Sequence, residues 1–210
     1  AANARVVTDM ELFDLLSRVQ KVQPQGQDVV DGRIQVNKID LRGLLNNMLH
    51  QRESANGPEK VAESEADIIN VVAMLFDFIL DDDNLPVPVK ALVGRLQIPL
   101  LKVAIKDKAF FNRGGHPARK LLNELARAGI GLTEDVDQLQ KDMVFKKIQS
   151  TVQRVLNDFN DDLALFDELL HDFSQFMQTE VRRSQMIEQR TRAAEEGKAK
   201  TELAEKTAFD

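Results

Sequence analysis

Basic side chains, a histidine and two glycines lie in or beside the segment from Leu96 to Ala126, where they can form a ligand site or a basic docking surface. Gly114 and Gly115 precede His116 and Pro117, a pattern typical of the start of a helix. A helix start offers unpaired backbone N–H groups and partial positive charge, so a phosphate or a carboxylate can bind there. The clustering of basic charge and this helix start together give the candidate binding residues, which are Arg95, Lys102, Arg113, Gly115, His116 and Arg119.

The same segment also has a purely structural interpretation, because a glycine pair followed by proline is ordinary loop-to-helix punctuation. No glycine-rich phosphate-binding motif accompanies it. Lys102 and Lys106 are four residues apart and share one helix face, which we interpret as a solvated face. Nucleic-acid binding is disfavoured because the chain contains no Trp or Tyr and carries a net charge of −6.

No other group of residues predicts catalysis or metal binding. Asp81, Asp82 and Asp83 lack the further ligands and the glycine of a calcium loop. The three histidines lie far apart, and the chain contains no cysteine to complete a zinc site. No glycine pattern of a nucleophile elbow surrounds any serine. We therefore predict no catalytic residue, no metal and no cofactor.

Charge alternates along the chain. Residues 59–84 carry eight acidic and one basic side chain, residues 85–127 carry nine basic and two acidic ones, and residues 155–180 carry seven acidic and no basic ones. Acidic and basic helices can neutralise each other inside one domain. Alternatively, an exposed basic face recruits an acidic partner. The flanking acidic segments favour neutralisation.

Helical periodicity dominates the sequence and predicts an all-α fold of about seven helices in antiparallel pairs. The hydrophobic content of 43% supports a buried core. The first predicted helix follows Thr8, and the last begins near Asp161. The helices between them span residues 38–52, 64–80, 89–96, 118–125 and 134–158, and a helix also continues past Pro99. Residues 53–60 are predicted to form a loop, and Asp31-Gly32 marks the one candidate β-hairpin.

Several local signals refine these helices. Thr8 to Glu11 and Ser64 to Asp67 both have the spacing of a capping box. The helix up to Leu80 is apolar almost all round, so we expect it to be the most buried element. Pro99 either kinks its helix or starts a new one, and Gly129 is the expected end of another helix.

The pattern divides the chain into N-terminal helices (1–58), a core helical domain (59–187) and a charged helical tail (188–210). The tail has no apolar stripe to bury, so we expect it to project, fray or pair with another segment. The chain starts without Met, which we interpret as a fragment of a larger protein. No apolar run is long enough to span a bilayer, and the absence of Cys fits a reducing compartment, so we expect a cytoplasmic location.

Residues 73–125 resemble a family of large bacterial proteins catalogued as a domain of unknown function, some of whose members are labelled "thymidine phosphorylase-like". The matching landmarks are residues 76–79, 90–92, 94–102, 110–111 and 116–123. The resemblance brings no catalytic residues with it. Phosphorolysis of a nucleoside needs a phosphate cradle and a base pocket, normally built between two sizeable domains, whereas this segment is a single helical one.

The sequence therefore predicts a non-enzymatic helical interaction or regulatory module within a larger bacterial cytoplasmic protein. Its partner is another protein or another part of the parent chain, and no membrane insertion is expected. An alternative prediction is a nucleotide- or phosphate-binding module that uses the helix start at residues 114–119.

Overall fold

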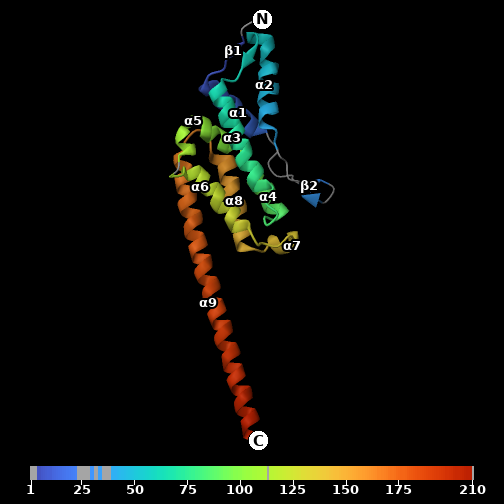
Figure 1. Cartoon of the computed structure of the whole chain (residues 1–210), viewed down its shortest axis with the longest axis vertical. Coiled ribbons are helices and arrows are strands. Elements are labelled where there is room, and N and C mark those ends of the chain that lie inside the picture. Colours follow the sequence, from blue (N-terminus) through green and yellow to red (C-terminus); the bar gives the residue numbers. More distant parts are fainter. Residues whose placement is uncertain (1–3, 23–28, 31–32, 35–38, 113, 210) are drawn as a thin grey trace. The chain divides into compact units, whose positions relative to one another are not determined.

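The computed structural model describes residues 4–22, 29–30, 33–34, 39–112 and 114–209 (Figure 1). The chain forms two units, Ala1–Phe173 and Ser174–Asp210. The predicted all-α fold is confirmed. The helices are α1 (Asp9–Val22), α2 (Leu41–Asn56), α3 (Glu63–Leu80), α4 (Val87–Gly94), α5 (Gln97–Lys106), the 3-10 helix η1 (Lys108–Phe111), α6 (Pro117–Gly129), α7 (Val136–Leu139), α8 (Met143–Asp158) and α9 (Ala164–Phe209).

Two short strand pairs accompany the helices. β2 (Val29–Val30) pairs antiparallel with β3 (Arg33–Ile34), which is the predicted hairpin; its turn at residues 31–32 lies outside the described residues. β1 (Arg5–Val6) pairs in parallel with β4 (Glu59–Lys60). The prediction of a loop at residues 53–60 is therefore wrong, because α2 continues to Asn56 and β4 begins at Glu59.

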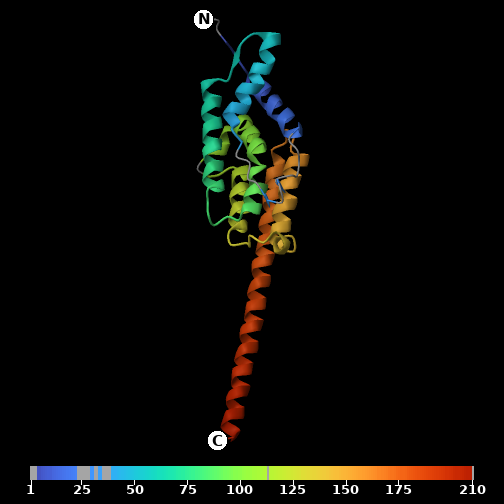
Figure 2. The same cartoon turned by 90° about the vertical axis from the view of Figure 1, so that its right-hand side faces the viewer.

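The core of the first unit is centred on α5. Every residue from Gln97 to Ile105 is buried, and α5 packs against α1 and α3, while α4 packs against α6 and α8. The expectation that the helix ending at Leu80 is the most buried element is wrong. α3 lies along one side of the bundle, and Figure 2 shows no helix on its outer side. It buries one apolar face and exposes another.

Helix starts follow the local sequence only in part. The Glu11 N–H donates to Thr8 Oγ1 (3.2 Å), which confirms the first predicted cap. The cap predicted at Ser64 is wrong, because α3 starts at Glu63 with Ala62 at the N-cap. Pro99 lies in the first turn of α5, so it belongs to a new helix rather than to a kink.

The predicted helix from residue 134 to 158 is interrupted, and α7 and α8 replace it. Asp142 stands at the break and accepts N–H groups from Val144 (2.8 Å) and Phe145 (3.1 Å). An aspartate at an N-cap satisfies backbone donors that would otherwise lack partners. α6 does end at Gly129, as predicted.

The second unit is the greater part of α9, from Ser174 onward. All residues from 181 to 208 are exposed, and Glu188 and Arg192 form an ion pair along the helix (3.1 Å). A helix without a buried face depends on its own propensity and on such pairs. In the described part of the chain, none of the helices is both long enough and apolar enough to cross a membrane.

Candidate functional site

Lys102 occupies a position that a hydrophobic residue would normally take. It lies in the middle of α5 with 1% of its surface exposed, between the buried residues Leu101 and Val103. The expectation of a solvated face is therefore wrong for Lys102, because α1 and α3 cover α5. Lys106, one turn later, is exposed and its ammonium donates to the Asp161 carbonyl oxygen.

The ammonium group of Lys102 contacts an amide and two aromatic rings. Its Nζ donates to Gln20 Oε1 (2.8 Å) and lies 4.9 Å from the ring centroid of Phe13 and 4.6 Å from that of Phe159. Gln20 is fixed, because its Nε2 donates to the carbonyl oxygens of Leu156 and Phe159 (both 3.2 Å). Among the described residues, no carboxylate lies within ion-pair distance of Lys102.

A cavity of about 540 Å³ opens beside this group. Lys102, Gln20 and Phe159 are its buried lining residues, and Asp14 and Asp161 are among its exposed ones. Burial lowers the pKa of Lys102 from 10.5 to about 8, and the positive charges of Lys21 and Lys106 act in the same direction, while the negative charge of Asp161 opposes them. Of the predicted binding residues that the structure describes, Lys102 alone lines this cavity.

The helix start at residue 117 is closed by its own histidine. His116 is buried, and its Nδ1 accepts the N–H of Ala118 (3.0 Å). The other ring nitrogen, Nε2, therefore carries the proton and faces Asp107 Oδ2 at 3.2 Å. Asp107 in turn caps η1 by accepting the N–H of Ala109 (3.0 Å). These contacts give His116 a structural role that needs no ligand.

The other predicted binding residues surround this turn or lie apart from it. Gly115 has φ of +78°, the left-handed conformation that glycine adopts without strain. Arg119 Nη2 donates to the Asn112 carbonyl oxygen (2.6 Å) and so ties α6 to the preceding turn. Arg95 is half-buried at the end of α4. Arg113 lies outside the described residues.

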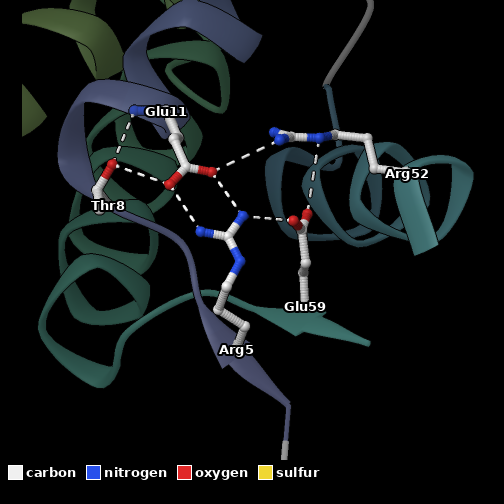
Figure 3. Close-up of polar contacts among 5 residues, drawn as sticks. All are labelled: Arg5, Thr8, Glu11, Arg52 and Glu59. Atoms are coloured by element: carbon white, nitrogen blue, oxygen red, sulfur yellow. Dashed lines mark hydrogen bonds and ion pairs between the residues drawn. The ribbon is translucent and has the colours of Figure 1, made fainter. Parts of the chain in front are cut away.

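A second cluster of charges joins the N-terminal elements, as Figure 3 shows. Arg5 donates to both oxygens of Glu11 (2.9 and 2.8 Å) and to Glu59 Oε1 (2.6 Å). Arg52 contacts the same two carboxylates, with its Nη2 3.5 Å from Glu11 Oε2 and its Nε 3.6 Å from Glu59 Oε2. β1, α1, α2 and β4 are thereby linked by alternating charges.

Pairing has a clear electrostatic effect in this cluster. Hydrogen bonds from Arg5 lower the pKa of Glu11 to about 2, and the same contacts raise the pKa of Arg5. The Glu59 side chain is completely buried, and its Oε2 accepts no hydrogen bond from the described residues. Its negative charge is nevertheless compensated by the two arginines.

The outer face of α3 is the third notable feature. Three large apolar side chains, Val71, Met74 and Phe78, are 47%, 69% and 80% exposed. Their spacing of three and four residues aligns them in one stripe along the helix. Asp67 lies in line with this stripe and Asp77 lies beside it, and both are exposed.

Sequence patterns missed the partners of Lys102, because Phe13, Gln20 and Phe159 lie far from it in the chain. One signal was available. Residues 96–105 form a nearly continuous apolar run that contains a single lysine. A helix that is apolar on most sides is buried on most sides, so this lysine is expected to be buried too. The aromatic residues around it carry no local signal of this kind.

Most of the chain matches a known protein family. No curated protein and no solved structure matches the chain. Residues 6–162 match the second domain of the DUF1631 family, described as proteins of unknown function, and this description contains no phosphorylase label. The matched region includes α3, Lys102 and the residues around its cavity. The chain therefore belongs to the DUF1631 family.

Proposed function

We propose that this domain is a non-enzymatic interaction module of a larger bacterial cytoplasmic protein, and that it docks a helix of a partner protein on the outer face of α3. The observation that carries this proposal is the exposure of Val71, Met74 and Phe78. A helix that is apolar on all sides is normally buried on all sides. An aligned exposed apolar stripe is typical of an interaction surface.

The charges of α3 define the partner. α3 contains no Lys or Arg, and the exposed Asp67 and Asp77 form no ion pair with any described residue. A complementary helix would place apolar residues on the stripe and Lys or Arg beside the aspartates. We therefore infer an amphipathic helix with basic edges as the occupant.

The basic residues selected from the sequence are less suited to docking. Lys102 is buried, so it cannot contact a partner protein on the surface. Arg119 is hydrogen-bonded to its own chain. Arg95 remains a candidate for an acidic partner, which the experiment below separates from the α3 surface.

The test measures binding of a synthetic amphipathic peptide, with leucines on one face and lysines along its edges, by fluorescence anisotropy. We expect saturable binding by the full chain, and no binding of a peptide in which glutamates replace the lysines. Met74→Ser/Phe78→Ser should weaken binding at least about tenfold, because apolar area is lost from the contact. Met10→Ser is the matched control, since Met10 is 77% exposed on α1.

Three outcomes would contradict the proposal. Equal binding by Met74→Ser/Phe78→Ser and Met10→Ser would show that the peptide does not use the α3 stripe. Loss of binding only in Arg95→Glu/Arg119→Glu, with the glutamate peptide preferred, would place the docking surface on the basic segment. Self-association that depends on Phe78, measured by sedimentation, would make a second copy the occupant.

A further inference from the structure

The cavity beside Lys102 raises a question that the docking function does not answer. A buried ammonium without a carboxylate partner is costly, and a Met or Leu side chain would fill the same space at lower cost. Gln20 supplies one neutral acceptor, and the faces of Phe13 and Phe159 supply weak attraction. Asp161 at the rim of the cavity adds a favourable but unpaired charge, so the positive charge of Lys102 is compensated only in part.

The chain holds this arrangement rigidly. The Gln20 amide is fixed by two carbonyl oxygens, so its Oε1 is directed at Lys102. Phe159 is buried and packs edge-on against Phe166, with ring centroids 4.9 Å apart. A cavity of about 540 Å³ has the size of a small-molecule site, and its lining is mainly polar, with Phe13, Leu156 and Phe159 as the apolar residues.

From this geometry we propose that the cavity binds a small organic monocarboxylate, whose carboxylate pairs with Lys102 and whose apolar body lies against Phe13 and Phe159.

The rim of the cavity narrows the class of ligand. Asp14 and Asp161 line it together with Lys21, so the opening carries both signs of charge. Two carboxylates at the opening repel a polyanion such as a nucleoside triphosphate, whereas a single negative charge can be placed beside the buried ammonium. Aromatic side chains beside the cation favour a flat or apolar ligand body.

The experiment uses the full chain and phenylacetate as the probe, with the neutral phenylacetamide as its isosteric control. Isothermal titration calorimetry at pH 7 should show saturable binding of phenylacetate and at least about tenfold weaker binding of the amide, because the charge–charge contact is lost. The Lys102→Met variant should bind phenylacetate no more tightly than phenylacetamide. Lys146→Met replaces an exposed lysine on α8 and should bind as the unchanged chain does.

A second readout reports on Lys102 itself. Chain labelled with 13C at the lysine Cε allows the titration of Lys102 to be followed by NMR with and without phenylacetate. The ligand should raise the pKa of Lys102 from about 8, and affinity should fall about tenfold per pH unit above that value. The charged groups around Lys102 are Asp14 and Lys21 from α1, Lys106 from α5, and Asp161 after α8. The titration of Lys21 and Lys106 is followed in parallel through the same label.

The proposal is overturned if phenylacetate and other aromatic monocarboxylates fail to bind at millimolar concentration, or if they bind the Lys102→Met variant equally well. Binding of inorganic phosphate that depends on Lys102, without binding of carboxylates, would also contradict the ligand class. Neither result bears on the α3 stripe, so the two proposals fail independently. Lys102→Gln is a second variant, for use if Lys102→Met does not fold.

Discussion

Glu59 and Lys102 are both buried, but the chain surrounds them differently. Glu59 has two arginines within ion-pair distance, one of which also donates a short hydrogen bond (Figure 3). Lys102 has one neutral amide and two aromatic rings, and no carboxylate from the described residues pairs with it. The first charge joins four elements of the fold, and the second lies beside a cavity.

This difference separates a structural charge from a candidate binding charge. A buried carboxylate compensated by two cations is sufficiently explained by the connection it makes between β1, α1, α2 and β4. The Lys102 ammonium forms no ion pair with any described residue, although the charge of Asp161 lies nearby, so no comparable connection between elements explains its burial. Burial alone therefore does not indicate function, whereas burial without an ion-pair partner, beside open space, marks a candidate site.

The largest expected effect concerns the stability cost of Lys102. Below about pH 8 the folded and the unfolded chain both keep its proton, and the cost of burying the charge is complete. Between about pH 8 and 10.5 the folded chain loses the proton while the unfolded chain retains it, so stability rises with pH. Relative to Lys102→Met, the free energy of unfolding of the unchanged chain should rise by about 1.4 kcal/mol per pH unit, or about 3 kcal/mol over the whole range.

Urea unfolding at a series of pH values measures this difference. Lys146→Met is the control, because Lys146 is exposed. The difference in free energy of unfolding between the unchanged chain and Lys146→Met should stay constant over this pH range. A difference between the unchanged chain and Lys102→Met that stays constant from pH 7 to pH 10 would mean that Lys102 titrates normally. The contrast with Glu59 would then disappear.

A smaller effect is expected for Glu59 when one of its cations is removed. Arg52→Met leaves Glu59 Oε2 without a cation, while Arg5 still donates to Oε1. We expect a loss of about 1–3 kcal/mol in the free energy of unfolding, the cost of an incompletely compensated buried charge. Arg127→Met is the matched control, since Arg127 is exposed and pairs only along its own helix. Equal stability of both variants would refute a structural role for the cluster.

Sequence patterns predicted the elements of this fold better than their environment. Helical periodicity placed the helices, and Thr8 and Gly129 marked their ends correctly. Periodicity could not show that Asp142 interrupts a helix, because an aspartate at an N-cap resembles any solvated aspartate. Two-residue strands such as β1 and β4 are too short to show an alternating pattern.

Environment was harder to predict because it depends on contacts between distant residues. The apolar composition of α3 predicted burial on all sides, but its neighbours cover only one face. Lys102 was among the candidate binding residues, but a solvated face was the wrong expectation for it, since the residues that enclose it come from α1 and from the end of α8. The sequence therefore named Lys102 only as one of several basic candidates, and its burial beside a cavity is a finding of the structure.

The smallest effect is expected for a solvent-exposed ion pair. Arg154 on α8 forms an ion pair with Glu168 of α9 (3.1 Å), and both side chains are substantially exposed. Hydrogen bonding to Glu168 raises the pKa of Arg154, but solvent screens such contacts, so a double-mutant cycle with Arg154→Ala and Glu168→Ala should give at most about 0.5 kcal/mol of coupling. A coupling as large as the effect of Arg52→Met would show that pairing, rather than burial, governs the strength of these charges. Burial would then lose its value as the criterion that sets Lys102 apart.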